Sequence, residues 1–160
     1  MATAFSYEQA FAAPPEQVLA MMCDPEFVRA KAEATAGSDI EVDVSQGDSG
    51  PQVSSTRSLP AEVPSYAAPF VGDTLTITEV QRWRPDAGPA VADVTVDFHA
   101  PLSYTGTITL VADGEGTVAR HRGEFKASVP FVGGKVEKVA AEQTERYLAK
   151  ETTVASTWLS

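Results

Sequence analysis

Apolar and polar residues alternate along several short segments of the chain, and this period of two predicts β-strands with one buried face. In residues 4–11 the large side chains Phe5, Tyr7 and Phe11 alternate with small or polar ones. The turn composition of Asp113-Gly114-Glu115-Gly116 predicts a hairpin between the last two strands. The same alternation predicts further strands over residues 40–44, 53–59, 74–84, 91–98, 104–111 and 117–129.

Two short helices are predicted between the first strand and the second. Pro14-Pro15-Glu16 opens the first helix, because proline is tolerated in the first turn and an acidic residue suits the helix N-terminus. Asp24 is placed to cap the second helix, which Pro25 begins and Gly37 is expected to end.

A much longer helix is predicted from Phe131 to Leu159, because no Gly or Pro follows Lys135 and apolar residues recur at helical spacing. Such a helix would be roughly 40 Å long and needs a broad apolar surface to lie on. The element order predicts an α+β fold: a curved antiparallel sheet of six to seven strands gripping a long C-terminal helix, with two short helices after the first strand. We expect residues 1–160 to form a single domain.

Composition narrows the classes of partner. The chain has 22 acidic against 12 basic residues, and its net charge of −10 disfavours nucleic acid and anionic membranes because it repels phosphates. Cys23 is the only cysteine, which fits a reducing compartment. The sequence shows neither a signal peptide nor an apolar run of the roughly 20 residues that span a bilayer. We therefore expect a cytoplasmic protein without membrane insertion, and leave its oligomeric state open.

Several segments carry a resemblance to known proteins. The first strand (5–8), the residues before the first helix (13–18) and those before the last helix (129–137) resemble the START-like, birch-pollen-allergen-like superfamily, also called SRPBCC. That superfamily has the helix-grip fold, and the resemblance covers the whole chain. Within it, an actinobacterial domain family of unknown function is similar to this chain over residues 82–85, 101–107 and 130–135.

The resemblance implies a cavity between the sheet and the last helix, where relatives hold lipids, sterols, polyketides or plant metabolites. A minority of relatives catalyse cyclisation or dehydration there. The proline-rich stretch 60–72 carries Tyr66 and Phe70 and is either a lid at the mouth of the cavity or a loop packed against the core. Inward-facing apolar side chains form either plain core or the wall of this cavity; those expected at the wall are Leu75, Ile77, Trp83, Tyr104, Ile108, Phe125 and Val139.

Three polar side chains fall on inward positions. Gln143 and Tyr147 lie within the apolar stripe of the last helix, so Gln143 is either a satisfied core amide or a ligand contact. His121 shares strand parity with Phe125 and should point inward, where it could bind a polar head group or transfer protons. A twist or bulge in the strand would instead expose it.

More specific catalytic and metal-binding motifs are missing from the sequence. Gly134-Lys135 lacks the other features of a phosphate-binding loop, and two distant histidines with one cysteine give no zinc spacing. No Gly-x-Ser-x-Gly motif occurs. We therefore assign no catalytic residue, no metal ligand and no cofactor.

Three hypotheses of function follow. The first is a cytoplasmic, non-catalytic binder or carrier of a small hydrophobic molecule, such as a lipid or polyketide, between the sheet and the C-terminal helix. The second is a small cyclase- or dehydratase-type enzyme using the same cavity, with His121 and Tyr147 as acid and base. The third is a co-chaperone-like module that contacts a protein through its acidic exterior or proline-rich loop.

Overall fold

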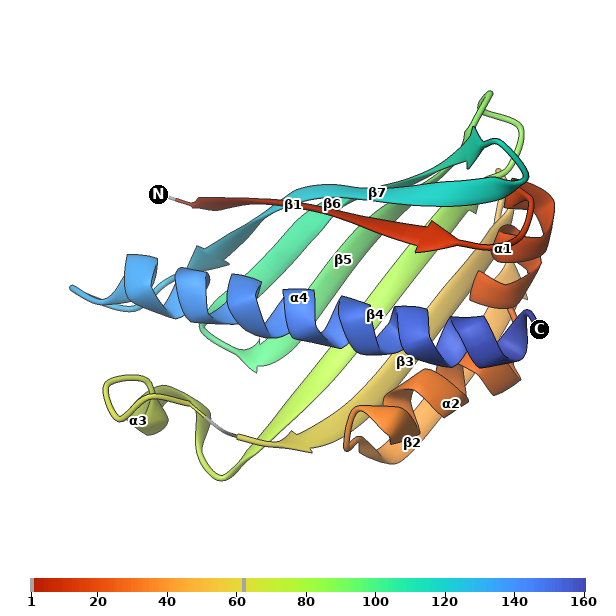
Figure 1. The fold of residues 1–160 in the computed structure, drawn as a ribbon. Coiled ribbons are helices and arrows are strands. Elements are labelled where there is room, and N and C mark those ends of the chain that lie inside the picture. Colours follow the sequence, from red (N-terminus) through yellow and green to blue (C-terminus); the bar gives the residue numbers. More distant parts are fainter. Residues whose placement is uncertain (1, 62) are drawn as a thin grey trace.

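The chain folds in the order predicted from its hydrophobic pattern (Figure 1). A computed structural model describes residues 2–61 and 63–160, so Met1 and Glu62 of the predicted domain lie outside the described residues. The elements are β1 (Thr3–Phe11), α1 (Pro15–Met22), α2 (Pro25–Ala34), β2 (Ser38–Gln46), β3 (Pro51–Pro60), α3 (Ala68–Val71), β4 (Thr74–Arg84), β5 (Ala90–Ala100), β6 (Leu102–Asp113), β7 (Gly116–Ala127) and α4 (Gly133–Trp158).

The strands form one antiparallel sheet of seven, in the order β1-β7-β6-β5-β4-β3-β2. Strands β2 to β7 pair consecutively, whereas β1 pairs with β7. Figure 1 shows α4 crossing the inner face of the curved sheet, with α1 and α2 beside its C-terminal end. The predicted α+β helix-grip architecture is therefore confirmed. No helix among the described residues is long and apolar enough to cross a membrane.

The second short helix begins as predicted but ends differently. The Asp24 carboxylate accepts a hydrogen bond from the Glu26 backbone N–H at 2.9 Å, which caps α2. At the other end the left-handed residue is Ala36, with φ of 64°, and not the predicted Gly37. Glycine is needed at 37 for close approach, because a Cβ there would lie 2.7 Å from the Ala32 carbonyl oxygen.

A pair of glycines makes room for aromatic side chains on the inner face. Gly106 and Gly123 lie opposite each other on β6 and β7. A Cβ on either would come within 2.5 Å of the Tyr104 hydroxyl, so the Tyr104 side chain lies directly over this bare patch of backbone. Its ring packs against Phe125, with centroids 4.8 Å apart, and edge-on against Phe5 at 5.9 Å. The glycine pair thus allows an aromatic floor close to the sheet.

The long helix is most deeply buried on the side next to its apolar stripe. Its most buried residues are Glu137, Leu148, Glu151 and Ala155, on the side that contacts β1, β7 and α2. The predicted stripe is only partly covered, and Gln143 within it is exposed. The stripe faces the cavity, so its side chains are not all packed against the sheet.

Glu137 fixes the start of α4 to the edge of the sheet. Its side chain is buried, and one carboxylate oxygen accepts from the Thr3 hydroxyl at 2.7 Å. The other oxygen accepts from the Ala127 backbone N–H at 2.8 Å. One carboxylate therefore joins β1, the end of β7 and the helix.

Replacing Glu137 by Ala should lower the free energy of unfolding by about 1–3 kcal/mol, because the Ala127 N–H and the Thr3 hydroxyl lose their acceptor. Urea unfolding followed by circular dichroism measures this. Glu142→Ala is the matched control: it removes an exposed carboxylate from the same helix and should change stability by less than about 0.5 kcal/mol. Equal effects of the two changes would contradict the role given to Glu137.

Candidate functional site

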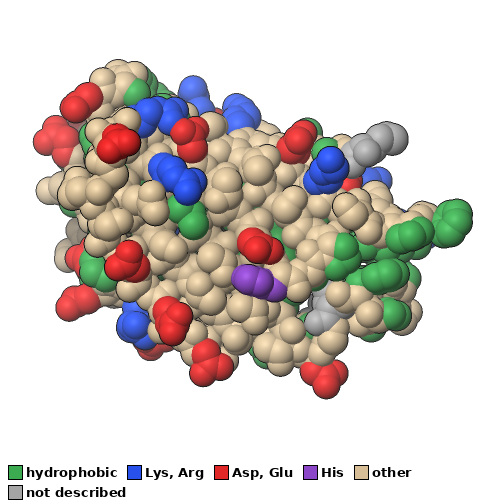
Figure 2. Space-filling view, turned by 180° about the vertical axis from the view of Figure 1, so that it is seen from behind, with side chains coloured by type: hydrophobic (Ala, Val, Ile, Leu, Met, Phe, Trp, Pro, Cys, Tyr) green, Lys and Arg blue, Asp and Glu red, His purple; other side chains and the backbone are tan. Residues whose placement is uncertain are grey.

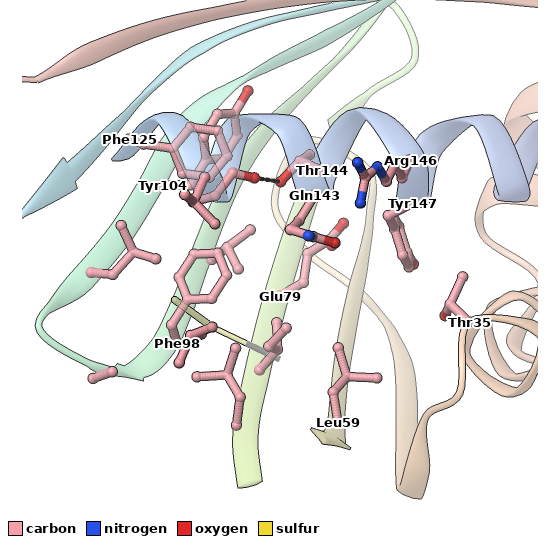
Figure 3. Close-up of a pocket in the computed structure, with 18 of the residues that line it drawn as sticks. Thr35, Leu59, Glu79, Phe98, Tyr104, Phe125, Gln143, Thr144, Arg146 and Tyr147 are labelled. Carbon is pink, nitrogen blue, oxygen red and sulfur yellow. Dashed lines mark hydrogen bonds between the residues drawn. The ribbon is translucent and has the colours of Figure 1, made fainter. Parts of the chain in front are cut away.

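A cavity of about 500 Å³ lies between the inner face of the sheet and α4 (Figure 3). Its size falls within the range of about 300–1,000 Å³ that small-molecule sites occupy. Strands β3 to β7, helix α4 and the stretch between β3 and β4 contribute its wall, which is mainly apolar. Phe70, Gln143 and Arg146 line the cavity and are also exposed, so they mark where it meets solvent.

The structure places eleven of the twelve predicted site residues on the wall of this cavity. Figure 3 shows Gln143 and Tyr147 pointing from α4 toward the sheet, with Glu79 of β4 beneath them. That these side chains contact a ligand stays a prediction. The eleven are Tyr66, Phe70, Leu75, Ile77, Tyr104, Ile108, His121, Phe125, Val139, Gln143 and Tyr147.

Trp83 is the predicted residue that does not line the cavity. Strand parity places it on the inner face together with Ile77, but it is only 1% exposed and lies within the packed core. Its indole N–H donates to the Gln81 side-chain oxygen at 3.1 Å, and Gln81 is the cavity-lining residue of the two. Parity identifies the face of a strand but not how far along the strand the hollow extends.

The proline-rich stretch between β3 and β4 forms part of the wall near the mouth. Tyr66 and Phe70 both line the cavity, and the Lys135 ammonium at the start of α4 lies 5.9 Å from the centre of the Tyr66 ring. Phe70 is 41% exposed, and Phe131 just before α4 is fully exposed. Figure 2 shows hydrophobic side chains gathered at this end of the molecule, while charged ones are scattered over the outer face of the sheet.

Four polar side chains form a buried network beside the cavity, and two of them, His121 and Glu151, line it. The Gln9 amide nitrogen donates to Glu151 Oε1 at 3.0 Å and lies 3.0 Å from the Leu148 carbonyl oxygen. Gln9 Oε1 lies 2.7 Å from His121 Nε2. Because an amide oxygen only accepts, His121 Nε2 must carry the proton. Glu151 Oε2 accepts from Lys31 Nζ at 2.7 Å, which completes the network.

The charges of Lys31 and Glu151 compensate each other. Both side chains are at most 5% exposed. Burial alone would raise the pKa of Glu151, but the Lys31 ammonium and hydrogen bonds from Lys31 and Gln9 outweigh it and lower the pKa below its ordinary value. Burial alone would lower the pKa of Lys31, but the charge of Glu151, its hydrogen bond, and the neighbouring Tyr147 and Glu79 together outweigh burial and raise the pKa. Both groups are therefore charged at neutral pH.

His121 and Tyr147 respond to burial in the opposite way from this ion pair. Burial lowers the pKa of His121, which keeps the imidazole neutral near pH 7 despite the acidic neighbours Glu151 and Glu79. Burial raises the pKa of Tyr147, so its phenol stays protonated. Both His121 and Tyr147 are therefore neutral near pH 7.

Two charged residues on neighbouring strands complete the polar part of the lining. Arg57 of β3 stacks on the Tyr147 ring, with its guanidinium carbon 4.6 Å from the ring centre. On β4, a carboxylate oxygen of Glu79 accepts from the Gln81 side-chain nitrogen at 2.7 Å. Among the described residues, no group of three or more His, Cys, Asp or Glu side chains is placed to hold a metal ion.

The sequence interpretation missed most of these polar residues, although strand parity contained a signal for them. Gln9 alternates in step with Phe5 and Phe11, and Arg57 with Val53 and Leu59, so each polar side chain shares a face with apolar ones. Glu79 and Gln81 likewise alternate in step with Ile77 on their own strand. A polar residue at a buried parity position should have been treated as a candidate site residue.

Comparison with known proteins identifies the family of this chain. Residues 6–159 match the profile of a family described as a protein of unknown function, DUF2505. No curated protein matches the chain by sequence.

Solved structures match over nearly the whole chain. TTHA0849 from Thermus thermophilus has a TM-score of 0.70 at 20% identity, covering 98% of this chain and 99% of that one. The Zhui aromatase/cyclase from Streptomyces sp. R1128 has a TM-score of 0.68 at 14% identity, covering 98% and 93%. A START superfamily protein from Mycobacterium smegmatis has a TM-score of 0.64 at 16% identity, covering 98% and 99%. These likenesses confirm the predicted START-like, helix-grip fold.

Replacing Lys31 by Met should lower the free energy of unfolding by about 3–5 kcal/mol, because Glu151 is left as a buried, uncompensated charge. The double variant Lys31→Met/Glu151→Gln removes both charges and keeps an acceptor for Gln9, so it should recover most of the loss. Urea unfolding of the single and double variants at neutral pH measures both values. A double variant no more stable than Lys31→Met would show that charge burial is not the cause.

His121 should make stability depend on pH. Its pKa is lowered from 6.5 on folding, so the unfolded chain takes up the proton first as the pH falls. The contribution of the neutral imidazole is therefore present above pH 6.5 and is lost as the pH falls through the lowered folded-state value. His121→Gln removes this titration and keeps a donor to Gln9.

The free energy of unfolding of His121→Gln should thus fall less than that of the wild type between about pH 7.5 and about pH 5.5. Glu151 affects stability in a separate, more acidic pH range, because its pKa is lowered from the ordinary value of 4.5 on folding. His99→Gln, at an exposed position, is the matched control and should keep the wild-type decrease. An unchanged decrease in His121→Gln would refute the assignment.

Proposed function

Because the chain belongs to the DUF2505 family, whose function is unknown, we propose its role from the site alone: the protein binds a small hydrophobic molecule between the sheet and α4. The observation that carries this proposal is the cavity of about 500 Å³ with a mainly apolar wall. Burial of apolar ligand surface in such a space is favourable by roughly 25 cal/mol per Å². A carrier or storage role follows if the ligand leaves unchanged.

The way the wall is built supports binding over a packing defect. The floor is made by packed aromatic rings, with Phe98 and Phe125 centroids 6.3 Å apart, so the sheet side is firm. On the opposite side α4 presents Val136, Val139 and Ala140, which are too short to fill the hollow beneath them. An apolar space between two well-anchored layers is suited to a guest molecule.

The class of partner also follows from charge and composition. The net charge of −10 supports a small molecule over nucleic acid. We propose a cytoplasmic location, which the single cysteine supports. A lipid or polyketide-like molecule suits the apolar wall and the size of the cavity.

The enzyme hypothesis finds less support in the geometry. His121 and Tyr147 both line the cavity, but the His121 Nε2 proton is already donated to Gln9. Burial also raises the pKa of Tyr147, which makes its phenol a weaker acid near neutral pH. The interaction-module hypothesis would use the acidic exterior or the proline-rich loop, and the exposed Phe70 of that loop equally suits an apolar approach to the cavity.

A larger side chain placed inside the cavity should weaken binding. Ala140→Phe projects a ring from α4 into the space, and Ala149→Phe places the same ring on an exposed position of the same helix. Titration with Nile red, a neutral apolar dye, should show an affinity about tenfold lower for Ala140→Phe than for wild type. A tenfold loss corresponds to about two CH₂ groups of the dye that are no longer buried. Ala149→Phe should bind as the wild type does.

Native mass spectrometry of freshly purified protein provides a second test of the same proposal. A wild-type protein that neither carries a guest nor binds Nile red would overturn the proposed function. Equal dye binding by wild type and Ala140→Phe would place the dye outside the cavity.

A further inference from the structure

Arg57 is the feature of the cavity that the binding of a purely apolar molecule does not explain. It lies on β3 with its side chain on the cavity wall, and it is only 6% exposed. An arginine keeps its charge at any physiological pH. Buried arginines are therefore normally paired with a carboxylate or hydrogen-bonded to several acceptors.

Arg57 has no such partner within the described part of the chain. It takes part in none of the ion pairs there, and its Nε atom is buried without any hydrogen-bond partner. Its one specific contact is the face of the Tyr147 ring, 4.6 Å from the guanidinium carbon. A ring face holds a guanidinium in place but accepts none of its directional hydrogen bonds.

The neighbouring charges are already engaged or too far away to pair. Lys31 and Glu151 neutralise each other. Glu79 lies on the same inner face. It is diagonal to Arg57, because Arg57 pairs with Ile77 and Glu79 pairs with Ser55. The Glu79 carboxylate already accepts a hydrogen bond from the Gln81 side chain. Arg57 thus provides an unpaired donor fork at the wall of an apolar hollow.

We propose that Arg57 binds the carboxylate of an amphipathic hydrophobic acid whose apolar body fills the cavity. This inference rests on the proposed function and names its ligand class. A carboxylate matches the planar guanidinium fork through two parallel hydrogen bonds. A singly charged head group fits better than a phosphate dianion, because Glu79 nearby would repel a second negative charge.

The test compares decanoic acid with 1-decanol, two probes that share a chain length and differ in the charged head group. Isothermal titration calorimetry at pH 8, where the acid is ionised, should show that the wild type binds decanoate at least about tenfold more tightly than decanol. Arg57→Met should abolish this preference and keep decanol binding. Arg82→Met is the matched control, because Arg82 lies on the neighbouring strand β4 at an exposed position away from the cavity lining; it should keep the preference.

Urea unfolding of the unliganded variants separates a binding role from a structural one. Arg57→Met should be at least as stable as wild type, because it replaces a buried, unpartnered charge with an apolar side chain of similar length. A less stable Arg57→Met would assign Arg57 to the scaffold and overturn the inference.

The outcomes distinguish the inference from the proposed function. Equal affinity of the wild type for decanoate and decanol, or a preference that survives in Arg57→Met, would overturn the carboxylate site and leave hydrophobic binding standing. Binding of neither probe by the wild type would overturn both.

Discussion

Two buried carboxylates on α4 are the interactions on which the rest of the structure depends. Glu137 fixes the beginning of the helix to β1 and the end of β7, and Glu151 fixes its second half to Gln9 and Lys31. The helix rises about 21 Å between them. Over that distance it is held at its ends, so its middle can cross the concave sheet without packing into it. A cavity results because these polar contacts hold the helix at both ends of this stretch, while short side chains such as Val139 and Ala140 face the sheet between them.

The architecture was predictable from the sequence because it depends on local patterns. Alternation marks the strands, Asp24 and Pro25 mark a helix start, and the uninterrupted stretch after Lys135 marks the last helix. Parity also assigned most cavity-lining side chains to the correct face. Parity also gave the correct face for Trp83, but it did not show that this residue lies beyond the cavity. How far a cavity extends along a strand depends on the neighbouring strands and on α4.

The polar network could not be derived in this way, because its contacts join residues far apart in sequence. Gln9 and Glu151 are separated by 142 positions, and nothing in either local segment specifies the other. The helical wheel placed the apolar stripe of α4 toward the sheet, but it did not show that the adjoining side, with Glu137 and Glu151, is the most deeply buried. Here two carboxylates face the packed side and a partly apolar stripe faces the cavity. What the sequence contained was a weaker signal, namely polar side chains such as Arg57 at positions where parity predicts burial.

The order of strands in the sheet has a consequence for how the protein is made. Strand β1 pairs with β7, so the first strand to leave the ribosome waits for the last one before its hydrogen bonds can form. The cavity needs α4 as well, which follows β7 in the chain. During synthesis the apolar floor of the sheet therefore stays uncovered until α4 has been made. The proposed binding site is complete only after α4 has docked on the sheet.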